Sequence, residues 1–311
     1  MGVVRLAVES RVAPQTGEAN SFPSSLAQVA ADYVALLKPR IILLLVVTEL
    51  GAMITAARGW PSAGVLVGSV AGGALAAGGA GAINCWFDRD IDAVMPRTRR
   101  RPIAAGRIAP MHGLLFGIAV AAVGVALVGL SSNLLAAGLA AAGGLVYVFV
   151  YTMWLKRTTA QNIVIGGAAG AFPPLVGWAA VTGSLSPLAW ALFAIIFFWT
   201  PPHFWALALL LRRQYSAVNV PMLPVVVGPV RTRRAILAYT AIMLVISLVP
   251  ALWLGPVYTV ASIALGAVFF GLALSAVRDD GGESAMALFH YSLIYLALLF
   301  VAAPLAATVR L

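Results

Sequence analysis

The residues best suited to chemistry are an amide and two carboxylates that recur every four positions. Asn84, Asp88 and Asp92 stand at the end of an apolar segment, in a 311-residue chain that has only ten Asp and Glu. On a helix, residues four apart lie about 40° apart in azimuth and roughly 6 Å apart along the axis, so the three side chains share one face. Oxygen ligands of this kind suit a hard divalent cation such as Mg²⁺. We therefore expect Asn84, Asp88 and Asp92 to hold a metal and to form the catalytic centre.

Arginines follow this motif directly, at Arg97, Arg99, Arg100 and Arg101. Guanidinium groups bind phosphates through paired, charge-assisted hydrogen bonds, so the segment suits a polyanion. Metal-dependent diphosphate chemistry at a membrane surface is the first functional interpretation. The competing interpretation is a solvated loop in which the two aspartates only pair with these arginines.

Two other carboxylates are expected to have different surroundings and roles. Asp90 would point about 120° away from the Asn84 face, so we expect it to be exposed or paired with an arginine. Glu49 lies in the middle of the first apolar segment, where a charge is costly. We expect Glu49 to be neutral or paired there. Packing or a polar relay is as good an interpretation of its role as catalysis.

Further polar residues lie at the ends of apolar segments. Lys156 and Arg157 could bind phosphate or anchor their segment at the cytoplasmic surface. Gln161 and Asn162 could orient a substrate or cap a helix. His203 has neither cysteines nor carboxylates beside it, so stable metal ligation is not expected.

The composition is that of a membrane protein with many spans. Hydrophobic residues make up 62% of the chain and charged residues only 10%, which is far from the usual balance of a soluble domain. Apolar runs of span length predict an all-α, polytopic protein with nine transmembrane helices around a central cavity. The expected spans are 41–57, 62–85, 111–130, 134–154, 162–182, 187–211, 235–254, 257–277 and 287–307.

Basic residues give the expected orientation. The N-terminal segment and the loops after the second, fourth, sixth and eighth spans hold 18 of the 20 Lys and Arg, which leaves Arg58 and Arg310 for the other side. The positive-inside rule then places the N-terminus in the cytoplasm and the C-terminus outside. The net charge of +10 reflects topology and attraction to anionic lipid, and no nucleic-acid partner is implied.

The domain organisation is simple. Residues 1–25 are rich in Ser, Pro and Ala and are expected to form a mobile cytoplasmic tail. Residues 26–311 should form a single membrane domain that begins with an interfacial helix over 26–37.

The lone Cys85 permits no internal disulfide. Pro173–Pro174 and Pro201–Pro202 should bend the fifth span and break the sixth, which leaves room for a central pocket.

Several segments together resemble the UbiA superfamily of intramembrane prenyltransferases, and within it the heme O synthases. The resemblance rests on Asn84, Asp88 and Asp92, on LKRTTAQNIVIGG at 155–167, on WTPPHFWALA at 199–208, on VPMLP at 220–224 and on YSLIYL at 291–296. It extends from about residue 38 to about residue 302.

This resemblance implies a cell inner-membrane enzyme that transfers the farnesyl group of farnesyl diphosphate to a vinyl group of heme B. The resemblance also implies Mg²⁺ as the cofactor and the lipid bilayer as the surroundings. Association with heme-modifying or terminal-oxidase assembly proteins is implied as well. The residues assigned to substrate binding are Arg40, Arg97, Arg101, Lys156, Arg157, Asn162, His203, Gln214 and Tyr215.

One position departs from the family pattern. Heme O synthases have an Asp before the Tyr in the loop after the sixth span, and here Gln214 precedes Tyr215. Either one carboxylate cluster suffices for the metal, or the activity is altered. Two other functions therefore stay open: a related prenyltransferase with another aromatic acceptor, and a heme- or isoprenoid-binding protein that has lost catalysis.

Overall fold

The computed structural model describes residues 25–279 and 282–309, and they form helices and loops. The predicted tail is 1–25. Residues 1–24 lie outside the described part, and only Ser25 is described. A helix is found where an interfacial helix was predicted, as α1 (Leu26–Leu36). The long helices are α2 (Pro39–Ala57), α3 (Ala63–Phe87), α5 (Pro110–Ser131), α9 (Ala168–Thr182), α10 (Pro187–Leu210), α13 (Gly228–Leu248), α14 (Ala251–Arg278) and α15 (Glu283–Thr308). The fourth span is built from α6 (Leu134–Leu145), the π-helix η1 (Val146–Leu155) and α7 (Lys156–Thr158).

The all-α, multi-pass fold predicted from composition is confirmed, with a smaller number of clear spans. Eight helical segments among the described residues are long and apolar enough to cross a membrane, where nine were predicted. The ninth, α13, has 21 residues, but its first two turns contain Arg231, Arg233 and Arg234. Its uncharged part, 235–248, is about 21 Å long at 1.5 Å per residue, which is shorter than a hydrocarbon core of about 30 Å.

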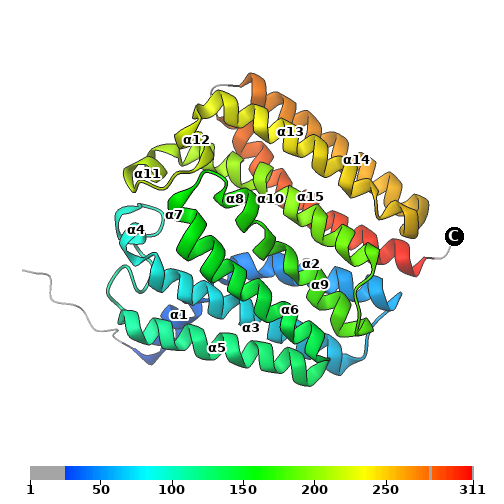
Figure 1. The fold of residues 1–311 in the computed structure, drawn as a ribbon, viewed down its shortest axis with the longest axis horizontal. Coiled ribbons are helices and arrows are strands. Elements are labelled where there is room, and N and C mark those ends of the chain that lie inside the picture. Colours follow the sequence, from blue (N-terminus) through cyan, green and yellow to red (C-terminus); the bar gives the residue numbers. More distant parts are fainter. Residues whose placement is uncertain (1–24, 280–281, 310–311) are drawn as a thin grey trace, which may run out of the picture.

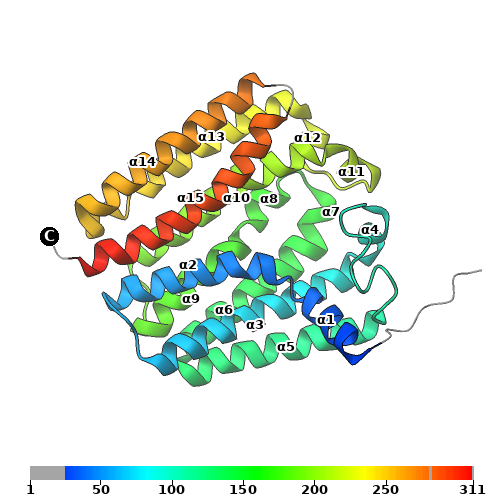
Figure 2. The ribbon, with the colours of Figure 1, turned by 180° about the vertical axis from the view of Figure 1, so that it is seen from behind.

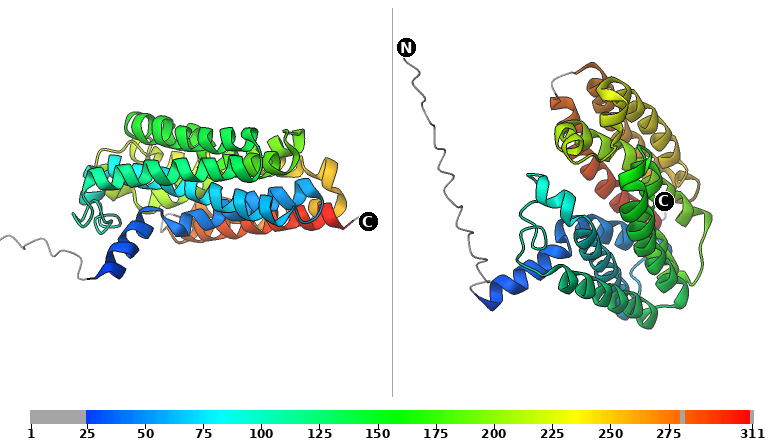
Figure 3. Two further views of the ribbon diagram at one scale, coloured as in Figure 1. Left: turned by 90° about the horizontal axis from the view of Figure 1, so that it is seen from below. Right: turned by 60° about the vertical axis from the view of Figure 1, so that its left-hand side comes forward.

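The long helices run side by side and place the short helices at one end of the bundle (Figures 1 and 2). There lie α4 (Arg89–Val94), α7, α11 (Arg212–Ala217) and α12 (Leu223–Val226), all outside or at the edge of the apolar segments. The described C-terminal end of α15 lies at the opposite end. Figure 3 shows α1 leaning away from the bundle at the end that holds α4. The loops with most of the basic residues therefore meet at one surface.

The break predicted at Pro201–Pro202 in the sixth span is not found. α10 is continuous from Pro187 to Leu210 through Pro201 and Pro202, and α9 continues through Pro173 and Pro174. Each proline removes one helical hydrogen bond, but α10 packs against α9, α13 and α15, whose contacts hold the segment in place. The break in the fifth span lies instead between α8 (Asn162–Gly166) and α9, at Gly167.

The outer surface of the bundle is suited to lipid. Val123 on α5, Leu252 and Val260 on α14 and Val245 on α13 are exposed apolar side chains. The interior is aromatic, with Trp205, Tyr258, Phe269, Tyr295 and Phe300 fully buried. Large apolar residues on the outside are stable only where the solvent is itself apolar, so these faces agree with a membrane setting.

Candidate active site

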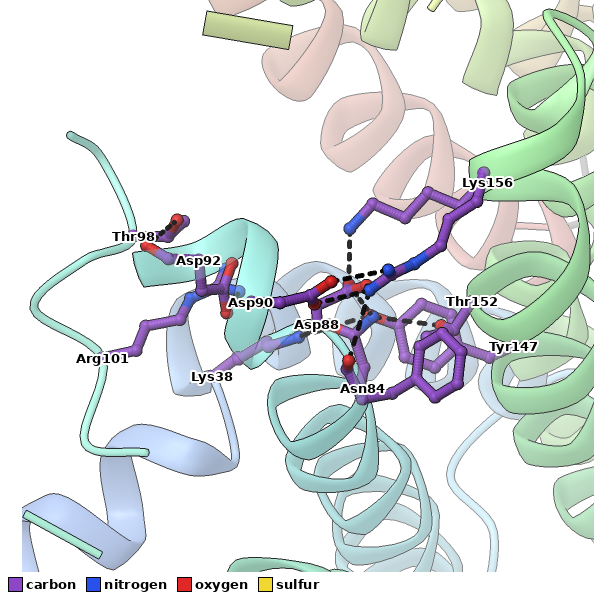
Figure 4. Close-up of polar contacts among 12 residues, drawn as sticks. Lys38, Asn84, Asp88, Asp90, Asp92, Thr98, Arg101, Tyr147, Thr152 and Lys156 are labelled. Carbon is purple, nitrogen blue, oxygen red and sulfur yellow. Dashed lines mark hydrogen bonds and ion pairs between the residues drawn. The ribbon is translucent and has the colours of Figure 1, made fainter. Parts of the chain in front are cut away.

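Asn84 and Asp88 form the centre of the site, at the end of α3. The backbone N–H of Asp88 bonds to the carbonyl of Asn84, and the N–H of Asp92 to that of Asp88, so helical bonding passes from α3 into α4. The Asn84 Nδ2 atom donates to Asp88 Oδ2 at 2.7 Å and to Thr152 Oγ1 of η1 at 3.0 Å. Both Asn84 and Asp88 are buried. The predicted shared face is present for this pair (Figure 4).

Two lysines from other helices complete the cluster. Lys156 Nζ lies 2.5 Å from Asp88 Oδ2, and Lys38 Nζ donates to Asn84 Oδ1 at 2.6 Å. Lys38 stands before the first residue of α2, with φ 57° and ψ 56°, a left-handed backbone that few residues with a Cβ adopt. This conformation belongs to the sharp turn between α1 and α2. The turn brings the ammonium group to α3, and Tyr147 Oη on η1 lies 3.4 Å from it.

Asp92 has a different partner from the one its spacing suggests. Its Oδ2 atom accepts a bond of 2.7 Å from Arg101, in the loop after α4, and its carbonyl accepts one from Thr98 Oγ1. Burial of Arg101 lowers the pKa of its guanidinium, but Asp92, with smaller contributions from Cys85 and Tyr147, outweighs burial, and the pKa is raised. The side chains of Asp92 and Asp88, both among the described residues, are not hydrogen-bonded to each other. Asp92 therefore ties the arginine-rich loop to the motif.

Asp90 faces solvent and Arg157, as the helical geometry predicted. Its carboxylate is 60% exposed and receives two bonds from the guanidinium, at 2.8 and 2.7 Å. This pair lowers the pKa of Asp90 to about 2. Arg157 also stacks on the Phe87 ring and reaches Asp88 Oδ1 at 3.4 Å.

The loop after α10 contributes a buried hydroxyl and a buried amide oxygen. Tyr215 on α11 is 3% exposed. Burial raises the pKa of its hydroxyl, and Arg97 and Arg101 act against this rise. Gln214 Oε1 is buried and has no hydrogen-bond partner. At the position where related sequences are expected to have a carboxylate, this chain therefore offers a free acceptor.

The other predicted residues are less closely tied to the cluster. Arg40 is exposed in the first turn of α2, and Asn162 is buried, with its amide nitrogen bonded to the Thr159 carbonyl and its Oδ1 free. His203 packs between Trp199 and Phe289, and its Nδ1 lies 2.6 Å from Ser292 Oγ.

Glu49 belongs to the helix packing between the site and the far end of the bundle. Its side chain is buried on α2, and its Oε1 has no partner. A Cβ added at Gly73 on α3 would meet its carboxylate, and one added at Gly177 on α9 would meet its backbone oxygen. Two glycines thus make room for this residue, which supports the packing alternative for Glu49.

The donor atoms of the site fit a hard cation with a phosphate ligand. Oxygen atoms are available from Asp88, Asp92 and Asn84, and carboxylate and amide oxygens are what Mg²⁺ binds in proteins. No cluster of three or more His, Cys, Asp or Glu is found in the described ranges, so an ion would need further oxygens from its substrate or water. Lys38, Lys156 and Arg101, which now contact these groups, are placed to bind the anion that accompanies the ion.

Sequence reasoning missed Lys38, Tyr147 and Thr152 as parts of the site. Lys38 is 46 residues from Asn84 and Thr152 is 68 residues away, so no local spacing connects them. A charged residue directly before the proline that begins the first span was the available signal for Lys38. A π-helix, which is rare and is frequent at functional sites, was not predictable from the apolar pattern of 146–155.

The comparisons with known proteins agree with this all-helical membrane bundle. The chain belongs to the UbiA prenyltransferase family, which it matches over residues 44–306. It is 52% identical over 273 residues to the protoheme IX farnesyltransferase of Roseiflexus sp. (strain RS-1), covering 87% of this chain and 51% of that protein. With the protoheme IX farnesyltransferase of Acidiphilium cryptum (strain JF-5) it shares 50% identity over 289 residues, 89% of this chain and 90% of that one.

The relatives differ in length. This chain spans about half the length of the Roseiflexus protein and 45% of a protoheme IX farnesyltransferase of Thermus thermophilus, which is 53% identical over 273 residues, or 87% of this chain. Among solved structures, a digeranylgeranylglyceryl phosphate synthase superposes with a TM-score of 0.74 at 17% identity, over 90% of this chain and 98% of that one. A UbiA homologue from Archaeoglobus fulgidus bound to DMAPP and Mg²⁺ gives 0.68 at 18% identity, over 90% and 100%. These likenesses establish the fold.

Proposed function

We propose that this chain transfers the farnesyl group of farnesyl diphosphate to a vinyl group of heme B, giving heme O and diphosphate. The observation that carries the proposal is the buried Asn84–Asp88 pair held between Lys38 and Lys156. It occurs in a chain about half identical to proteins named protoheme IX farnesyltransferase. The polar cluster is the basis for proposing diphosphate binding. The names of the relatives are the basis for proposing heme B as the acceptor and farnesyl as the prenyl group.

The basic groups around the motif are the proposed diphosphate ligands. Lys156 and Arg101 each contact an aspartate, and Arg97 lies near Tyr215 at the same end. A diphosphate that enters with a divalent cation brings nearly balanced charge, so these ion pairs can rearrange around it without leaving a buried charge unpaired. Arg40, Arg157, Asn162, His203, Gln214 and Tyr215 complete the proposed substrate contacts.

Asp88 and Asp92, with Asn84, are the proposed Mg²⁺ ligands. The Archaeoglobus homologue was solved with DMAPP and Mg²⁺, which supports a metal in this fold. When bound, the ion neutralises charge that develops on the departing diphosphate. The protein's part is to hold Asp88 and Asn84 in one orientation, which Lys38 and Thr152 do through the amide of Asn84.

The reaction is a substitution at an allylic carbon. The bond between C1 of the farnesyl group and the diphosphate oxygen breaks, and the electron pair leaves with the diphosphate. A vinyl carbon of heme B forms the new bond to C1 with its π electrons, which leaves a cation beside the porphyrin. Water adds to that cation and loses one proton to solvent, giving the hydroxyalkyl group. Lys156 and Arg101 stabilise the charge that develops on the leaving group.

The location proposed is the cell inner membrane, with the basic end of the bundle in the cytoplasm. Heme-modifying and terminal-oxidase assembly proteins are the proposed neighbours, because they would supply or consume the heme. The orientation can be measured with a single cysteine at Arg100 in a Cys85→Ala background. Labelling of intact cells by an impermeant maleimide would contradict it, and labelling only after lysis is expected.

The function is tested with purified protein, heme B, Mg²⁺ and farnesyl diphosphate, followed by mass spectrometry of the heme. Heme O should form and should carry one oxygen from solvent when the reaction is run in H₂¹⁸O. Geranyl diphosphate and 4-hydroxybenzoate, supplied as alternative donor and acceptor, test the related prenyltransferases. Farnesylated hydroxybenzoate without heme O would contradict the acceptor, and tight binding of both substrates without product would indicate lost catalysis.

A further inference from the structure

A cavity lined in part by polar residues lies at the end of the bundle opposite to Asn84. It has a volume of about 610 Å³ and is enclosed by the end of α2, the beginning of α10, the beginning of α14 and the end of α15. Figure 1 shows these helix ends gathered near the described C-terminal end. Because α2 has 19 residues, its two ends are roughly 28 Å apart. The cavity is therefore separate from the cluster around Lys38.

The polar side chains that line this cavity are Thr55, Arg58, Trp178 and Ser186. Arg58 is an exposed residue, and none of the described residues that line the cavity is an Asp or Glu. Among the described residues, Arg58 takes part in no salt bridge. Helix ends of both signs meet at the cavity: α10 begins there at Pro187, and α2 and α15 end there. Their dipoles oppose one another, so the charge that favours an anion here is that of Arg58.

Trp178 adds a hydrogen-bond donor to the cavity wall. Its side chain is more than nine-tenths buried and lines the cavity. Of the other buried indoles in the described bundle, that of Trp199 donates to the Ser292 carbonyl and that of Trp205 has no partner. No such bond is formed by Trp178 within residues 25–279 and 282–309. A polar group that enters the cavity can accept from this N–H.

The remaining wall is apolar and lies at interfacial depth. Trp253, Leu254, Val257 and Val309 contribute apolar surface to the cavity. Exposed tryptophans at Trp60, Trp190 and Trp253 mark this end of the bundle, and such side chains concentrate at the boundary between lipid and water. An occupant with a charged head and an apolar body fits a wall of this kind better than a small soluble anion does.

We propose that the cavity around Arg58 and Trp178 binds the anionic head of a membrane amphiphile. A phosphate of an acidic phospholipid and a propionate of a heme share the required chemistry: an oxyanion attached to an apolar body. Arg58 supplies the opposite charge, and Trp178 donates a hydrogen bond to the same head. The lipid form of this proposal holds whether or not the chain is a farnesyltransferase, whereas the heme form rests on that function.

The test measures binding of short-chain phosphatidylglycerol and phosphatidylcholine to the whole purified protein in neutral detergent by native mass spectrometry. Saturable binding of one phosphatidylglycerol, with much weaker phosphatidylcholine binding, is expected. Arg58→Gln should weaken it about tenfold, since charge-assisted hydrogen bonds are roughly twice as strong as neutral ones. Arg58→Lys should retain most of it, and Trp178→Phe should weaken it less.

Arg278→Gln is the matched control, because Arg278 is also an arginine at the end of a spanning helix, at the opposite end of the bundle. Equal losses in Arg58→Gln and Arg278→Gln, or equal binding of the two lipids, would overturn the proposal. Addition of heme B then identifies the source. Displacement of bound phosphatidylglycerol by heme B assigns the site to a propionate, and failure to displace it assigns the site to the lipid head.

Discussion

Lys38 and Asn84 are joined by a bond of 2.6 Å between the lysine Nζ and the amide oxygen. This bond fixes which end of the Asn84 amide points at Asp88, because the oxygen is taken by the lysine and the nitrogen is left to donate to the carboxylate. The residue before the first span thus orients the motif at the end of the second. Lys38 is therefore a positioning residue as well as a nearby cation.

Lys38→Met is expected to lower kcat/KM by roughly tenfold to a hundredfold, in line with the loss of one or two charge-assisted hydrogen bonds. Arg278→Met is the control, since Arg278 is exposed at the end of α14 and is not among the proposed substrate contacts. Both changes remove one positive charge from the same membrane edge. Steady-state assays with farnesyl diphosphate as the varied substrate separate the two. Equal losses in both variants would mean that Lys38 acts only through general charge.

Asp88→Asn should abolish transfer, with a loss on the order of 10² or more, because an amide cannot replace a carboxylate in stabilising the leaving group. It should also lower stability by about 3 kcal/mol, because the partly buried Lys156 loses its charged partner. Adding Lys156→Met should recover most of that stability without restoring activity. Thermal unfolding in detergent and single-turnover assays measure the two effects. Recovery of activity in the double variant would show that the pair is only structural.

Asp90→Asn should retain most of the activity and change the pH dependence of stability. The pKa of Asp90 is about 2, below its ordinary value of 3.8, because Arg157 bonds to the carboxylate. Its contribution is therefore present above pH 4 and is lost as the pH falls toward 2. We expect the melting temperatures of the two proteins to differ by about 1–3 °C at pH 6, as for an exposed ion pair, and to converge near pH 2. A constant difference over this range would contradict the assignment.

The spacing of the motif predicted the Asn84–Asp88 pair, because four-residue periodicity on a helix leaves little freedom. Most spans were predictable from the length and hydropathy of the apolar runs. The exception is α13, because its arginines lie within the helix. Pairing of the aspartates with the arginines at 97–101 was the competing interpretation, and Asp92 does pair with Arg101. Which arginine it pairs with was not predictable, since Arg101 reaches it through the folding of a loop. Continuity of α10 through Pro201–Pro202 depends on neighbouring helices that a local sequence pattern does not describe.

Gln214→Asp tests the position at which the family resemblance leads us to expect a carboxylate. Gln214 Oε1 is buried without a partner, so a carboxylate there would supply a charged oxygen in place of a neutral one. We expect the variant to need less Mg²⁺ for half-maximal activity, since hard cations prefer charged oxygens. Gln161→Asp, at an exposed amide of the same end, is the control. A raised KM for farnesyl diphosphate with unchanged Mg²⁺ dependence would show instead that the loop binds phosphate through Arg212 and Arg213.

The central claim is that the cluster around Asp88 is the diphosphate site. An experimental structure with Mg²⁺ and farnesyl thiodiphosphate, an analogue whose leaving group departs slowly, tests it most directly. The account predicts the ion against Asp88 and Asp92 and the diphosphate oxygens within hydrogen-bonding distance of Lys156 and Arg101. A diphosphate bound elsewhere, with the Lys156–Asp88 and Arg101–Asp92 pairs unchanged, would contradict it.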